Sequence, residues 1–121
     1  MDRDLFQDLV ERAVRSLPEE YAQRLENVDV VIEDWPLPHQ VSKSRLKRNQ
    51  MLLGLYEGVP LTHRGPGYGL VPPDKITIFQ KPIEDKCRRE GEIEAEVRAV
   101  VIHEIGHFFG ISDERLKELG R

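Results

Sequence analysis

Two histidines four residues apart, with a glutamate directly after the first, are the residues of this chain best suited to carry out chemistry. His103, Glu104 and His107 form the string H-E-x-x-H. On a helix, residues four apart lie on one face, so both imidazoles can bind the same metal ion. Catalytic zinc sites use three protein ligands, often histidines, and leave a fourth position for water. The string therefore predicts a zinc (Zn2+) site with His103 and His107 as ligands.

Glu104 has a different predicted role from the two histidines. Because it follows the first ligand by one residue, its carboxylate lies beside the metal rather than opposite the ligands. From there it can take a proton from a water molecule that zinc has made more acidic. We therefore predict that Glu104 is the general base of a hydrolase and not a metal ligand.

The third predicted ligand is Asp113. The string continues as H-E-x-x-H-x-x-G-x-x-D, in which Gly110 turns the chain and Asp113 follows the first histidine by ten residues. Aspartate is an accepted zinc ligand, and the longer metzincin string has the same layout. The alternative is that Ser112, Asp113 and Glu114 begin a last helix, where acidic side chains favour the positive end of the helix dipole.

The segment that carries the string is predicted to be a helix. Its apolar residues recur every three or four positions, as on one face of a helix. They are Ile93, Val97, Val100, Val101, Ile105 and Phe108. Gly110 follows the last of them and is well placed to end the helix. An ordinary core helix with two metal-free histidines is the alternative, but the helical context favours the metal site.

The rest of the chain is expected to form short helices and strands. They are a helix over residues 4–16, a short helix that begins at Pro18, and strands over residues 28–33, 51–56 and 75–80. Residues 37–49 lack periodicity and are predicted to form a surface loop that includes His39. Residues 83–91 are predicted to be a charged connector. Gly54 interrupts the second strand and indicates that another backbone approaches closely there.

Three other groups of side chains have a possible chemical role in the sequence. His63, Arg64 and Tyr68, in a loop rich in glycine and proline, are candidates to stabilise a developing oxyanion. Cys87 lies among basic residues that can lower the pKa of a thiol, but no base stands near it, which favours a structural role. A basic cluster is predicted to be a solvated face rather than a phosphate site; it comprises Lys43, Arg45, Lys47 and Arg48.

Three stretches of the chain resemble the small bacterial zincin-like metallopeptidases. They are LLGLYEGVP at 52–60, DKITIF at 74–79 and VIHEIGHFFGISDE at 101–114. The resemblance implies an α+β, zincin-like fold in which a small mixed sheet of three to four strands packs on the long metal-binding helix and an N-terminal helix. It also implies a zinc site at His103, His107 and Asp113, with Glu104 as base. The second strand is then a candidate for the edge strand that pairs with an extended peptide, and a purely structural strand is the alternative.

Length and composition restrict the possible classes of protein. The 121 residues suit one domain, over 1–121, and the net charge of -4 argues against a general nucleic-acid binder. Cys87, the single cysteine, permits no internal disulfide, and no apolar run approaches the roughly 20 residues of a membrane span. The first residues lack the apolar core of a signal peptide, so we expect a cytoplasmic protein.

The combined prediction is a zinc-dependent hydrolase that cleaves peptide bonds in a peptide or unfolded protein substrate. A metal-dependent endoribonuclease of the kind that matures ribosomal RNA is an alternative, since such proteins also carry two histidines four apart. They typically lack a glutamate after the first histidine and end the string with histidine rather than Asp-Glu. Glu104 and Glu114 therefore argue against that alternative. A metal-binding interaction module without catalysis is a third possibility.

Overall fold

The structure is a computed structural model that describes residues 1–25, 28–43, 51–58, 74–111 and 114. Its elements are α1 (Arg3–Arg15), α2 (Glu19–Ala22), the 3-10 turn η1 (Gln23–Leu25), β1 (Val28–Glu33), α3 (Pro38–Lys43), β2 (Gly54–Glu57), β3 (Asp74–Phe79), α4 (Gln80–Lys86) and α5 (Glu90–Phe108). The helices expected at the two ends of the chain and all three expected strands are present, with ends that differ by a few residues.

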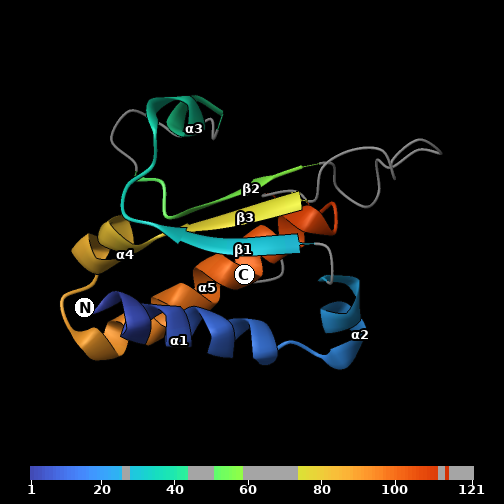
Figure 1. Cartoon of the computed structure of the whole chain (residues 1–121), viewed down its shortest axis with the longest axis horizontal. Coiled ribbons are helices and arrows are strands. Elements are labelled where there is room, and N and C mark those ends of the chain that lie inside the picture. Colours follow the sequence, from blue (N-terminus) through green and yellow to red (C-terminus); the bar gives the residue numbers. More distant parts are fainter. Residues whose placement is uncertain (26–27, 44–50, 59–73, 112–113, 115–121) are drawn as a thin grey trace.

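The three strands form one mixed sheet in the order β1-β3-β2. β1 runs parallel to β3, and β2 runs antiparallel to it, with Gly54 opposite Ile78. The long helix α5 packs on β2 and β3, and α1 packs against α5 on the same side of the sheet (Figure 1). This arrangement confirms the predicted α+β architecture of a small mixed sheet, a long helix and an N-terminal helix.

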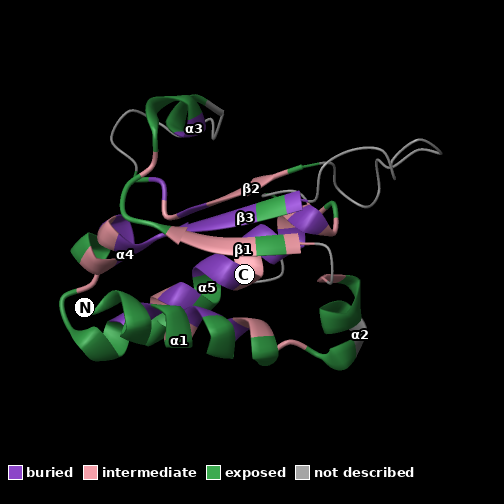
Figure 2. Ribbon diagram, viewed as in Figure 1, coloured by how far each residue is buried: buried purple, intermediate pink, exposed green. Residues whose placement is uncertain are grey.

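The core lies between the sheet and the two long helices. Figure 2 shows that the buried residues gather on α5, on β3 and on the inner face of α1. The helices contribute the residues that the apolar periodicity indicated, and the middle strand contributes alternate residues; among them are Phe6, Val10, Ala13, Ile76, Ile78, Val97, Val101 and Ile105. Because α5 buries one face against the sheet and α1, it is a stiff support for the side chains near its C-terminal end.

The prediction of a loop over residues 37–49 is wrong for its first part, which forms α3. The backbone N–H of Leu37 donates a hydrogen bond of 2.8 Å to Oε1 of Gln40, whose side chain is buried. His39 therefore lies in a helix and not in a loop. A helix of six residues is too short to show an apolar repeat, so periodicity had no signal to detect.

The charged connector predicted over residues 83–91 is also wrong in part, because α4 occupies Gln80–Lys86. Gln80, predicted to end the third strand, is instead the first residue of this helix. Pro82 falls in the first turn, where a missing backbone N–H leaves no helical hydrogen bond unmade. Proline thus marks the beginning of a helix here rather than the end of a strand.

The buried amide of Gln80 connects α4 to the start of the chain. Its Oε1 accepts a hydrogen bond of 2.7 Å from Nε of Arg3, and its Nε2 donates to the carbonyl of Met1 and to Oε1 of Glu84, both at 2.8 Å. Burial alone would raise the pKa of Glu84, but the Gln80 hydrogen bond and the nearby amino group of Met1 bring this pKa below its ordinary value. The network fixes α1 relative to α4.

Among the helices that the structure describes, none combines the length and the apolar character that a membrane span requires.

Candidate metal site

The three residues of the H-E-x-x-H string come together on the C-terminal half of α5. One potential ligand atom from each of His103, Glu104 and His107 lies within 4.8 Å of the others. Nε2 of His103 is 3.2 Å from Nε2 of His107, and the two rings meet edge to face with centroids 4.8 Å apart. The same ring nitrogen of each histidine therefore points toward a common position.

The spacing of these two nitrogens suits a zinc ion. In a tetrahedral site with Zn–N distances of about 2.0–2.1 Å, two ligand nitrogens stand about 3.3 Å apart. Both rings are half-buried, so they are held by packing and still face solvent. A hydrogen bond between one protonated and one unprotonated ring nitrogen is the alternative explanation for the short distance. Such a hydrogen bond does not explain why the Glu104 carboxylate lies beside the histidine pair.

Glu104 is buried against the edge strand, with 7% of its surface exposed. A Cβ atom added at Gly54 would lie 3.2 Å from Cγ of Glu104 and 2.6 Å from Cγ1 of Val100. The close approach predicted at Gly54 is therefore confirmed, although its nearest neighbours are side chains of α5 rather than another backbone. β2 begins at this glycine and so starts three residues later than the strand predicted over 51–56.

The helix ends immediately after His107 in a well-defined cap. Gly110 has a φ of 82°, and its N–H donates to the carbonyl of His107 at 2.9 Å. The N–H of Ile111 donates to the carbonyl of Gly106, also at 2.9 Å. This pair of bonds is the Schellman motif, which satisfies carbonyls that the helix leaves unpaired. Gly110 is confirmed as the residue that ends the helix.

Replacing Gly110 with alanine is expected to destabilise the protein by about 1–2 kcal/mol, because a residue with a Cβ is strained in the left-handed conformation. The free energy of unfolding in urea measures this effect. Gly91→Ala is the matched control: a Cβ there meets no atom within 4 Å, and the residue lies in the first turn of α5. Equal stability of the two variants would contradict the assigned role of Gly110.

Aromatic contacts that no sequence pattern predicts pack around the end of α5. The ring of Phe108, next to His107, meets Tyr56 of β2 edge to face at 5.9 Å and Phe109 at 5.2 Å. Phe109 in turn meets Tyr21 at 5.3 Å. These contacts join elements far apart in the sequence, and no local pattern identifies such partners.

The other candidate residues contribute nothing further to the site in the described part of the chain. The predicted third ligand, the three oxyanion candidates and most of the basic cluster lie outside the described residues; they are Asp113, His63, Arg64, Tyr68, Arg45, Lys47 and Arg48. Burial raises the pKa of the Cys87 thiol, and the carboxylates of Glu96 and Glu92 raise it further. An activated thiol has a lowered pKa, so the raised pKa of Cys87 agrees with a structural role.

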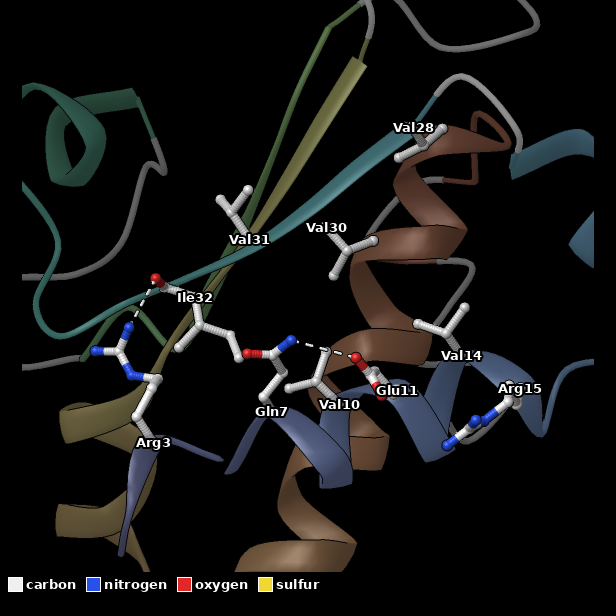
Figure 3. Close-up of a pocket in the computed structure, with 10 residues that line it drawn as sticks. All are labelled: Arg3, Gln7, Val10, Glu11, Val14, Arg15, Val28, Val30, Val31 and Ile32. Carbon is white, nitrogen blue, oxygen red and sulfur yellow. Dashed lines mark hydrogen bonds between the residues drawn. The ribbon is translucent and has the colours of Figure 1, made fainter. Parts of the chain in front are cut away.

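A groove on another part of the molecule is separate from the candidate metal site. It has a volume of about 470 Å³ and lies between α1 and β1 (Figure 3). β1 contributes only apolar residues to its lining, and α1 contributes both apolar and polar ones: Arg3, Gln7, Val10, Glu11, Val14, Arg15, Val28, Val30, Val31 and Ile32. Since no residue of α5 or β2 lines it, the groove takes no part in the chemistry of the histidine pair.

Comparison with known proteins decides the family. The sequence profile of zincin-like metallopeptidases matches residues 25–121, which include the whole sheet and the histidine pair. The chain belongs to the zincin-like metallopeptidase family. No curated protein matches. Among solved structures, a conserved hypothetical protein from Thermus thermophilus is similar over 98% of this chain and 97% of its own, with 24% identity and a TM-score of 0.58.

Membership of the zincin-like metallopeptidase family confirms the resemblance inferred from the three sequence stretches. At 24% identity, the likeness to the Thermus protein shows a shared fold. For a zincin-like metallopeptidase, the convergence of one nitrogen from each histidine next to a buried carboxylate is the arrangement that metal binding requires. The geometry and the family therefore support a metal-binding site on α5.

Proposed function

We propose that this protein is a zinc-dependent hydrolase of peptide bonds, with Glu104 as its general base. The observation that supports the proposal is the 3.2 Å approach of Nε2 of His103 to Nε2 of His107, next to a carboxylate that the edge strand buries. The ligands of the zinc ion would be these two nitrogens and, as a further part of the proposal, Asp113. The proposed substrate is a peptide or an unfolded protein.

The chain's own residues carry the proton transfers in this proposal. Zinc, when bound, polarises the scissile carbonyl and makes water more acidic. Glu104 accepts a proton from the attacking water and then, as a carboxylic acid, passes it to the departing amine. Contact with β2 restricts the Glu104 side chain to few conformations, which keeps its carboxylate beside the histidine pair.

The position of β2 suggests how a substrate is held. β2 is at one edge of the described sheet and packs directly on α5 at Glu104. An edge strand offers backbone donors and acceptors to which an extended peptide can add as a further strand. We propose that the substrate binds along β2, which brings its backbone close to the histidine pair.

A cleavage assay tests the proposed function. Zinc-loaded protein is incubated with an unfolded protein such as casein and, in parallel, with a structured RNA. We expect cleavage of the casein, its loss on treatment with a zinc chelator, and its return when one equivalent of zinc is added. Degradation of the RNA instead would support an endoribonuclease. Failure of the zinc-loaded protein to hydrolyse any member of a broad peptide library would support a binding module without catalysis.

A further inference from the structure

The absence of a side chain at Gly54 leaves room for the side chain of Glu104. Gly54 is the first residue of β2, and the side chains closest to its missing Cβ come from α5. We propose that Gly54 is a positioning residue for the general base. Because Gly54 has no side chain, Glu104 can approach the sheet closely, and this approach determines where the carboxylate lies relative to the histidine pair. This inference rests on the proposed function.

The backbone conformation of Gly54 does not itself require glycine. Among the described glycines, Gly58 and Gly110 have a positive φ, whereas Gly54 does not. Gly54 is paired in regular antiparallel register with Ile78 of β3. An alanine would therefore fit the strand conformation without strain, and any effect of this substitution must come from what its methyl group contacts.

Three atoms limit the space for that methyl group. Cγ1 of Val100 would lie at 2.6 Å, Cγ of Glu104 at 3.2 Å and the backbone carbonyl oxygen of Thr77 at 3.3 Å. The Thr77 carbonyl belongs to the middle strand and is fixed by its neighbours on both sides. The side chains of Val100 and Glu104 must therefore move to make room for the methyl group.

A shift of Glu104 would move the reacting group itself. Its Cγ must move by a few tenths of an ångström, and the carboxylate is bonded directly beyond this atom. Neither His103 nor His107 supplies any of the three atoms nearest to the added methyl group. Gly54→Ala should therefore displace the base while leaving the two proposed ligands in place.

The experiment compares Gly54→Ala, Val100→Ala and the double variant with the parent. Val100→Ala removes the methyl carbon that would lie at 2.6 Å, so the double variant relieves this contact and keeps the one with Glu104. We expect Gly54→Ala to lower kcat about tenfold or more with little change in KM or zinc affinity. Val100→Ala should retain kcat within about twofold, because Val100 is apolar and is not among the residues proposed to bind zinc or to transfer a proton. The double variant should recover thermal stability but not kcat.

A second readout does not depend on peptidase activity. The visible absorption of the cobalt(II)-substituted protein reports the ligands and the groups around them. We expect Gly54→Ala and the double variant to alter this spectrum, and Val100→Ala to leave it unchanged. Recovery of the parent kcat by the double variant would overturn the proposal, since Gly54 would then act through Val100 alone. A parental cobalt spectrum in the double variant would also overturn it, even if the protein cleaves no peptide.

Discussion

Replacement of Glu104 by glutamine should abolish peptide hydrolysis and leave zinc bound. The amide has nearly the same shape as the carboxylate and fits the same space under Gly54, but it cannot accept a proton from water at neutral pH. Loss of a general base of this kind lowers the rate by about 10²–10⁴-fold. The measurements are kcat for a cleaved peptide and the zinc content of the same preparation.

Glu94→Gln is the matched control for this substitution. Glu94 lies on the same helix, is exposed, and pairs with Arg12 at 3.4 Å rather than with the histidine pair. It should retain the parent rate, because an exposed ion pair contributes little to stability and this one contacts no reacting group. If Glu104→Gln cleaved peptides as fast as Glu94→Gln, Glu104 would not be the base.

Replacement of His103 by alanine should remove zinc binding, and His107→Ala should do the same. Each variant loses one of the two nitrogens that converge at 3.2 Å. Changes to residues that only orient a ligand lower metal affinity by about 10- to 100-fold, so we expect a loss beyond about 100-fold when a ligand itself is removed. The affinity is measured by competition with a chromophoric zinc chelator.

Thermal unfolding checks the same prediction independently. Because an ion that binds the folded chain stabilises it, zinc should raise the Tm of the parent protein and leave that of His103→Ala unchanged. His39→Ala is the control: His39 lies in α3, apart from the histidine pair. An equal response to zinc in His39→Ala and His103→Ala would show that the histidine pair is not the binding site.

The elements that the sequence predicted well are those with a long local pattern. α1 buries Phe6, Val10 and Ala13, which recur at helical spacing, and α5 continues such a pattern over 19 residues. β1 was predicted with both ends correct. The short helices α3 and α4 were missed because each is stabilised by the contacts of one glutamine, Gln40 or Gln80, and not by a repeated apolar face.

In the candidate site, too, the local part could be predicted from the sequence and the contact between distant elements could not. His103, Glu104 and His107 could be grouped from the sequence because they lie within two turns of one helix, where spacing fixes geometry. The contact of Gly54 with Glu104 joins two elements far apart in the sequence, and only the packing of α5 on β2 brings them together. The glycine itself was a usable signal, since it falls inside the strand predicted over residues 51–56, although it begins β2 in the structure; its neighbour could not be inferred from the sequence.

Metal analysis of the purified protein, combined with its zinc X-ray absorption spectrum, would establish whether the histidine pair binds zinc. We expect one zinc ion per chain with imidazole nitrogens at about 2.0–2.1 Å, and loss of this ion in the variant that lacks both His103 and His107. Protein that takes up no zinc when titrated, or zinc that persists in the double variant, would contradict it.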